Sequence, residues 1–433
     1  MTGNPFTFGN PIKDPARFYG RTEEIRQIVS RLLSSAHEST SVVGERRIGK
    51  TSLLKHLENK EAAVDLGLTE DQYCLIYLDF QGLTDITPQR FWQRVLRKME
   101  RSIDIPDLVI ELQRVRGMEK FDLFDLEDLF ESIAAEGLTT VLLLDEFEYV
   151  TQNPNFGADF FGGMRALAIH QNFPLVTATR RELVDLCHSE EIKGSPFFNI
   201  FANIVLRPFK DEEVSDLLDG YMAETDLSFS GEDKELVDQL GGGYPFFVQM
   251  AGNYLVEAKR KGLQGDLLRK EVASSFDAQA DPHFSYFWSH SSESEKITLL
   301  ILISLSRQKP SKKTISSIEN ISKIHSRASL DVPELTKRGI LLEDKEANTF
   351  RLLSASLERW IAREILAVPG EEESKASVQE WLKTGGREEL DPVVGVLPKF
   401  KKKYWPIVSS MMLELSLELM GAVTWEILTK GAL

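Results

Sequence analysis

Short apolar runs alternate with amphipathic stretches over the first half of the chain. The apolar runs are continuous and of strand length, which is typical of strands buried on both faces of a parallel sheet. They end at Val43 or occupy 73–80, 139–148, 173–181 and 203–209, and amphipathic helices are predicted over 51–59, 88–103 and 121–135. Strands separated by helices make an α/β fold by the crossover rule, and we predict a three-layer core with a parallel sheet over residues 1–209.

Beyond residue 210 the pattern becomes helical. Amphipathic stretches fill residues 210–283. In residues 284–366, helical segments precede two short apolar segments that flank a polar tip at 344–348. Helices followed by a two-stranded hairpin describe a winged helix, and we predict one here.

Residues 367–433 form a separate tail, which begins with a Pro-, Gly- and Glu-rich linker. The segment Pro406–Leu428 is apolar and long enough for a membrane span, but Glu414, Glu418 and Glu426 would each cost about 2.5 to 3.5 kcal/mol at bilayer depth. We therefore expect no membrane span, and instead a helix that packs on its own domain or on another subunit. The basic run 399–405 is either a solvated face or a patch for an anionic partner.

Composition limits the classes of function. The formal net charge of −16 argues against attraction of the whole molecule to nucleic acid or anionic lipid, although a local basic face is compatible with an acidic chain. Cys74 and Cys187 are far apart and belong to no Cys/His cluster, which supports neither a disulfide framework nor a zinc site. With no secretion signal at the N-terminus, we expect a cytoplasmic protein.

One loop carries a phosphate-binding pattern. Gly44, Gly49, Lys50 and Thr51 fit Gly-x4-Gly-Lys-[Ser/Thr] between a predicted strand and a predicted helix. The alternative is a surface turn before an ordinary helix, but strand, loop and helix rarely occur together by chance. Glycines let backbone N–H groups face an anion at the helix N-terminus. The residues predicted to bind ATP here are Gly44, Glu45, Arg46, Arg47, Ile48, Gly49, Lys50, Thr51 and Ser52.

Within this loop, Lys50 is expected to reach the β- and γ-phosphates and Thr51 to hold Mg²⁺. The predicted strand over 139–148 ends in acids at the edge where open α/β sheets bind ligands. Asp145 is expected to orient Mg²⁺ through water, and Glu146 to polarise the attacking water. The alternative is that these acids merely end a strand.

Two further groups are candidates for nucleotide contacts. Phe18, Tyr19, Gly20 and Arg21 precede a helix start at Thr22, and this box is either a surface cap or the place where several ATPase families grip adenine. We favour the adenine contact. Arg180, at the end of the run 173–181, is expected to meet the γ-phosphate, or alternatively to pair with an acid nearby.

Taken together, these motifs resemble those of prokaryotic STAND ATPases, which belong to the AAA+ group and are close to archaeal-type and origin-recognition ATPases. The resemblance covers about residues 10–365. Its motifs occur in the family's order and are Phe18–Arg21, Gly44–Ser52, Leu144–Phe147, Thr179–Arg181, Ser195–Asn199 and Gly243–Pro245.

The resemblance implies an ATPase core, a helical lid whose Pro245 packs on adenine, and a winged helix behind the lid. It also implies that ATP opens a closed ADP-bound monomer and permits self-association. No arginine occurs between Arg181 and the fifth predicted strand, only Lys193, so a ring with a trans arginine finger is not expected.

Two functions follow as hypotheses. The first is an ATP-hydrolysing signalling switch, with defence as a role by family analogy and with a separate sensor or effector protein as a partner. The second is an origin-recognition-like ATPase that binds or loads DNA. Lys312, Lys313, Lys323 and Arg327 would supply phosphate contacts, but Asp331 and Glu334 at the start of the recognition helix argue against DNA. We favour the switch.

Overall fold

The computed structural model describes residues 3–189, 194, 196–306, 317–345 and 348–363, which form two compact units. One unit comprises residues 7–228, and the other comprises residues 3–6 together with the chain from Phe229 onward. The predictions for Lys193, Lys312, Lys313 and the tail 367–433 fall outside the described residues. In the described part of the chain, no helix is both long enough and apolar enough to cross a bilayer.

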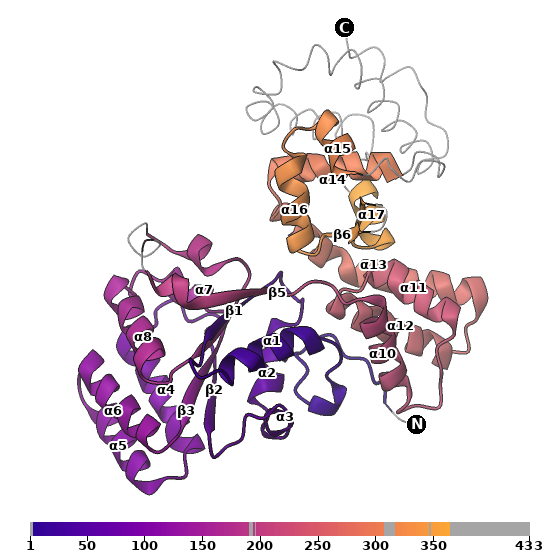
Figure 1. The fold of residues 1–433 in the computed structure, drawn as a ribbon. Coiled ribbons are helices and arrows are strands. Elements are labelled where there is room, and N and C mark those ends of the chain that lie inside the picture. The colour runs from indigo at the N-terminus through magenta and orange to yellow at the C-terminus, as the bar shows by residue number, and fades with distance from the viewer. Residues whose placement is uncertain (1–2, 190–193, 195, 307–316, 346–347, 364–433) are drawn as a thin grey trace. The chain divides into compact units, whose positions relative to one another are not determined.

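A five-stranded parallel sheet in the order β2-β3-β4-β1-β5 organises the first unit, which confirms the predicted α/β fold (Figure 1). The strands are β1 (Ser39–Val43), β2 (Tyr73–Asp79), β3 (Thr139–Asp145), β4 (Leu175–Thr179) and β5 (Phe201–Val205). The register pairs Asp79 with Asp145 and Val43 with Thr179. The carboxyl ends of four neighbouring strands therefore meet at one edge of the sheet.

Helices cover both faces of this sheet (Figure 1). Alternate residues of β2 and β3, among them Ile76, Leu78, Leu142 and Leu144, form one buried cluster with four helices on one face of the sheet. These are α4 (Pro88–Ser102), α5 (Pro106–Gly117), α6 (Leu123–Ala135) and α8 (Ala158–His170). Helix α2 (Lys50–Glu58), which follows the predicted phosphate loop, contacts β2, β3 and β4. Of the helices named above, α5 was not predicted from the sequence.

Further helices and 3-10 turns complete this unit. They are η1 (Pro15–Arg17), α1 (Thr22–Leu32), α3 (Lys60–Asp65), α7 (Glu148–Thr151), η2 (Leu183–Leu186), η3 (Pro196–Ile200) and α10 (Asp211–Met222). Helix α10 follows the predicted core, which ended at residue 209, yet it belongs to the same compact unit as the sheet. At its interior residue Gly220, a Cβ would overlap the ring of Tyr19, so a larger residue would have to displace that ring.

The second unit is mainly helical. It contains α11 (Gly231–Gly241), α12 (Pro245–Arg260), α13 (Gly265–Ser289), α14 (Glu293–Ser306), α15 (Ile318–Ile324), α16 (Ala328–Lys337), α17 (Ala355–Ile361) and a hairpin of β6 (Leu341–Asp344) and β7 (Thr349–Leu352). Residues 3–6 belong to it because Asn4 donates to the Asn253 carbonyl at 3.0 Å and Phe6 stacks on Phe229. The chain thus passes between the two units twice, at residues 6–7 and 228–229.

A buried polar cluster holds α14 against α16. Ser294 and Thr298 donate to the Oδ2 atom of Asp331 at 2.6 and 2.9 Å, and the His325 Nε2 atom lies 3.3 Å from the same oxygen. Burial raises the pKa of Asp331, but these hydrogen bonds outweigh it and leave the pKa below its ordinary value. The use of Asp331 as an argument against DNA is therefore wrong, because this carboxylate points into the core and not toward solvent. Glu334 is exposed, as that argument requires.

We predict that Asp331→Ala destabilises the second unit by about 3 kcal/mol, because two buried hydroxyls and an imidazole lose their acceptor. The exposed Glu334→Ala on the same helix is the control and should change stability by about 0.5 kcal/mol or less. Thermal unfolding of both variants measures the difference. Equal shifts in the two variants would show that the cluster does not stabilise this unit.

Candidate functional site

The loop between β1 and α2 is tightly wound. Gly49 and Arg47 have positive φ angles of 104° and 68°. A Cβ at Gly44 would come within 2.8 Å of Ile48 Cγ2 and 3.2 Å of Leu206 Cβ, so that only glycine fits without displacing its neighbours. No side chain caps the start of α2, which leaves its first N–H groups facing the loop.

Lys50 places a buried positive charge inside this loop. Its side chain is 5% exposed, and Nζ donates to the carbonyl oxygens of Gly44 at 2.7 Å and Glu45 at 3.2 Å. Both acceptors are neutral. Burial raises the pKa of Asp145 and of Glu146, and the ammonium charge of Lys50 opposes part of that rise. A phosphate at the helix N-terminus would add an anion where the buried charge needs one.

Asp145 is fixed by three hydrogen bonds at the end of β3. Tyr77 donates to Oδ2 at 2.9 Å, the Glu146 backbone N–H donates to Oδ1 at 3.0 Å, and the Thr51 side chain provides the third. Burial raises the pKa of this carboxyl, and the bonds to Thr51 and Tyr77 oppose the rise. A hydroxyl and a carboxylate side by side are the oxygen ligands that Mg²⁺ prefers, so these residues fit the ion. The hydrogen bond from Tyr77 to Asp145 could not be predicted from the sequence, because Tyr77 lies in an apolar run as any strand residue would.

Glu146 occupies a strained position beside Asp145. Its φ of 51° turns the chain sharply after β3. Burial raises the pKa of Glu146 to about 7, with further contributions from the charges of Glu148 and Asp145, while Lys50 and Arg180 act in the opposite direction. A carboxyl with this pKa is suited to accept a proton near neutral pH.

Arg180 makes an ion pair with Glu148. Its Nε atom donates to Glu148 Oε1 at 2.9 Å, and the Glu148 side chain is 1% exposed. The second Glu148 oxygen is buried without a hydrogen-bond partner. Of the two possibilities that the sequence left open for Arg180, the structure contains the pair with an acid, and contact with a γ-phosphate stays a prediction. The sequence predicted roles for Asp145 and Glu146 in the acidic end of this strand, but none for Glu148.

The Phe18–Arg21 box packs around the loop and α10. The Arg21 side chain is 4% exposed and donates to the Arg207 carbonyl at 2.7 Å and the Ile48 carbonyl at 2.9 Å. Its guanidinium also lies 4.7 Å from the ring centroid of Phe209. Arg21 thus ties the phosphate loop to the segment that enters α10, a structural task that the sequence did not reveal.

The other members of the box are also engaged in packing. Phe18 stacks on His56 of α2 with 4.3 Å between ring centroids, and Tyr19 meets Tyr221 edge-on at 5.4 Å. Gly20 has a φ of 73°. The adenine contact predicted for these residues is not tested by this geometry and stays a prediction.

An N-terminal segment also contacts the phosphate loop. The Ile12 backbone N–H donates to Ser52 Oγ at 3.1 Å, and Arg47 Nη1 donates to the Gly9 carbonyl at 3.2 Å. Pro245, by contrast, opens α12 in the other compact unit, so its predicted contact with adenine remains untested.

Comparison with known proteins places this geometry in context. The model of a family described as Novel STAND NTPase 2 matches residues 27–304. An uncharacterized ATP-binding protein of Methanocaldococcus jannaschii is 22% identical over 314 residues, which cover 61% of this chain and 79% of that protein.

Two solved structures are similar in fold. The Aeropyrum pernix ORC2 protein, in ADPNP-ADP complexes, has a TM-score of 0.50 at 17% identity and covers 84% of this chain and 98% of its own. A Walker-type ATPase of Pyrococcus abyssi has a TM-score of 0.50 at 15% identity and covers 82% of this chain and 98% of its own.

We predict that Arg21→Lys destabilises the first unit by about 2 to 3 kcal/mol, because an ammonium cannot donate to two separate carbonyls in a fixed fork and stack on Phe209. Arg26→Lys is the matched control, since Arg26 lies on α1 in an exposed ion pair with Glu23. Thermal unfolding compares the two. If Arg21→Lys unfolds at the same temperature as the control, Arg21 does not hold the loop.

Proposed function

Because this chain belongs to the Novel STAND NTPase 2 family, we propose that it is a switch that binds ATP, hydrolyses it slowly and changes conformation between the ATP and ADP states. The observation that carries the proposal is the meeting of Lys50, Thr51, Asp145 and Glu146 at one edge of the sheet. The names of similar proteins support ATP as the nucleotide, because one is described as an ATP-binding protein and another was solved in ADPNP-ADP complexes.

ATP binding is the first step of the proposal. The uncapped N-terminus of α2 and the buried ammonium of Lys50 stabilise the phosphates, and Thr51 and Asp145 supply oxygen ligands for Mg²⁺. When bound, Mg²⁺ neutralises charge that develops on the phosphate oxygens. The Phe18–Arg21 box and Pro245 would contribute the adenine contacts.

Hydrolysis is the second step. Glu146, whose pKa of about 7 lets it hold or release a proton, would orient a water and accept its proton as the bond to the γ-phosphate breaks. Arg180 would exchange the Glu148 carboxylate for a γ-phosphate oxygen, which offers the same sign of charge. Removal of that phosphate would return Arg180 to Glu148.

The switch rests on how the two units are connected. The phosphate loop, the box and α10 lie in one unit and Pro245 lies in the other, which we propose contains the lid helices after α10 and the winged helix. ATP favours whichever conformation of the chain binds it better, and it shifts the equilibrium only by that difference in affinity. Exposure of a surface for self-association, or for a sensor or effector protein, would follow. A role in defence rests on family analogy alone.

Binding of DNA is a second candidate function. The inward position of Asp331 favours it, because one of the two acids that argued against a recognition helix is buried and cannot repel a phosphate. Duplex binding that weakens steeply with salt would support this function, and its absence would support the switch.

We predict that Lys50→Ala reduces ATP affinity by about a hundredfold, because the variant lacks the buried charge that holds the phosphates. Lys60→Ala removes the same charge from an exposed residue of α3 and is the control. Titration with a fluorescent ATP analogue compares the two. Unchanged affinity in Lys50→Ala would show that the phosphate-loop assignment is wrong.

We further predict that Glu146→Gln binds ATP but hydrolyses it about a hundredfold more slowly, because an amide cannot accept the proton of the water. With ATP this variant should accumulate in the open state and form a larger assembly, whereas Lys50→Ala should not. Light scattering on both variants with ATP and with ADP measures the mass. Identical masses in all four conditions would contradict ATP-driven assembly.

A further inference from the structure

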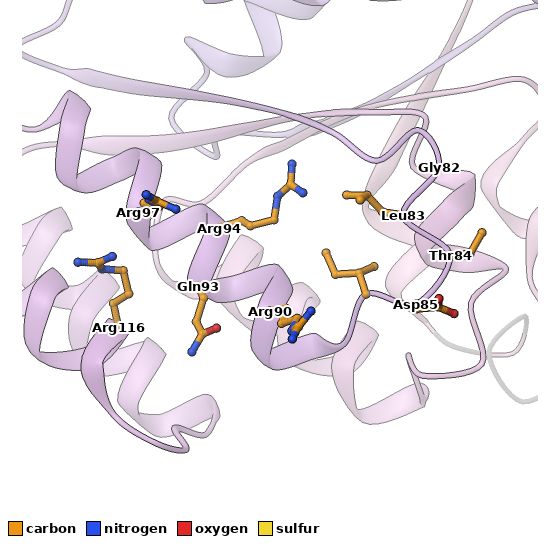
Figure 2. Close-up of a pocket in the computed structure, with 10 residues that line it drawn as sticks. Gly82, Leu83, Thr84, Asp85, Arg90, Gln93, Arg94, Arg97 and Arg116 are labelled. Atoms are coloured by element: carbon orange, nitrogen blue, oxygen red, sulfur yellow. The ribbon is translucent and has the colours of Figure 1, made fainter.

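A basic cavity lies on the first unit, between the loop after β2 and helices α4 and α5 (Figure 2). Its volume is about 620 Å³, and Arg90, Arg94, Arg97 and Arg116 contribute four guanidinium groups to its lining. Gln93 and residues 82–86 of the loop complete it. No residue of the phosphate loop lines this cavity, so it is distinct from the proposed ATP site.

Three of the arginines form one stripe along α4 (Figure 2). Arg90, Arg94 and Arg97 are four and three residues apart, which puts them on the same side of the helix, and all three are exposed. The opposite side of α4 is buried. Like charges at these spacings repel one another, and no carboxylate in the described part of the chain pairs with any of the three.

Arg116 of α5 is held in place at the same cavity. Its Nη2 atom lies 3.1 Å from Glu100 Oε2, and Gln113 donates to the other oxygen of that carboxylate at 2.8 Å. The Nε atom of Arg116 is buried without a hydrogen-bond partner. Arg116 thus contributes a guanidinium group whose position in the lining is fixed by its ion pair with Glu100.

The chemistry of the lining selects phosphate groups, and its dimensions select a small molecule. Guanidinium groups bind phosphate oxygens in pairs, and the stripe from Arg90 to Arg97 spans about 10 Å at 1.5 Å per residue, enough for more than one phosphate. A volume of about 620 Å³ is that of a small-molecule site. The acidic net charge of −16 and the presence of Asp85 in the lining disfavour a long polyanion such as duplex DNA.

Two contacts connect this cavity with the edge of the sheet that carries the acids. Arg94 Nη2 donates to the Asp79 carbonyl at 3.5 Å, and Asp79 is opposite Asp145 in the β2–β3 register. On the other side, Asn153 donates to the Ile86 carbonyl at 3.0 Å. Asn153 follows α7, which begins at Glu148, so an occupant that moves the 82–86 loop acts on both flanks of Asp145 and Glu146.

We propose that this cavity binds a small molecule carrying two or more phosphate groups, and that its occupancy regulates ATP binding at the neighbouring site. The binding part stands independently, and only the regulatory part rests on the proposed function. By thermodynamic reciprocity, such a ligand changes the affinity for ATP by the same factor as ATP changes the affinity for the ligand.

The test uses the full chain with its phosphate loop filled by ADP, so that a phosphate probe reports on the second site. Fluorescein-labelled pTpT, a dinucleotide with two phosphates and no adenine, is followed by fluorescence anisotropy. Arg94→Gln/Arg97→Gln should weaken its binding about tenfold or more. Arg114→Gln/Lys120→Gln removes two positive charges from exposed positions nearby that do not line the cavity, and it should bind as the parent does.

Three outcomes would overturn the proposal. The first is that neither pTpT nor inositol hexakisphosphate binds, and the second is that the two double variants bind pTpT equally. The third is that a short duplex DNA binds far more tightly than pTpT, which would make the arginine stripe of α4 a nucleic-acid interface. ATP affinity measured with and without pTpT tests regulation, and an unchanged value contradicts it. Normal ATP binding together with absent pTpT binding would reject this site alone, whereas absent ATP binding would reject the proposed function.

Discussion

Three carboxyl groups crowd into four residues at the end of β3, and the rest of the site is arranged around their mutual repulsion. Asp145 and Glu148 are buried and Glu146 is partly buried between them. Like charges repel strongly where water is excluded. Lys50 and Arg180 are the cations that face them. Because each cation also has the chemistry to bind phosphate, the entry of a nucleotide must redistribute the charges, and this is a physical basis for a two-state site.

The position of Lys50 depends in turn on Arg21. A charged side chain that is 4% exposed must satisfy its donors, and Arg21 does so with the carbonyls of Ile48 and Arg207 and the carboxylate of Glu24. The same contacts join the phosphate loop to the start of α10. This explains why α10, the first α-helix after the sheet, belongs to the same compact unit as the sheet, although its sequence reads like that of the helices that follow.

The two compact units give the site its potential for regulation. The chain passes between them twice, and the phosphate loop and the acids of β3 lie wholly in the first unit. The basic cavity beside α4 belongs wholly to the first unit, and it reaches the acids through the ends of β2 and α7. The proposed nucleotide and the proposed second phosphorylated ligand would therefore act on the same cluster of acids through different elements.

Local sequence determined the central strands, though not every helix, and it carries the pattern of the predicted phosphate loop. The apolar runs predicted the central strands because a strand buried on both faces has no polar alternation, and the loop was recognised because its glycines, lysine and threonine are adjacent in the chain. The order β2-β3-β4-β1-β5 and the partners of Arg21, Tyr77 and Glu148 needed the tertiary structure. Those contacts join residues that are distant in sequence, and no local pattern encodes them. The orientation of Asp331 was likewise misjudged, because an acid at a helix start is compatible with solvent or with a buried set of hydroxyls, and only packing against α14 decides between them.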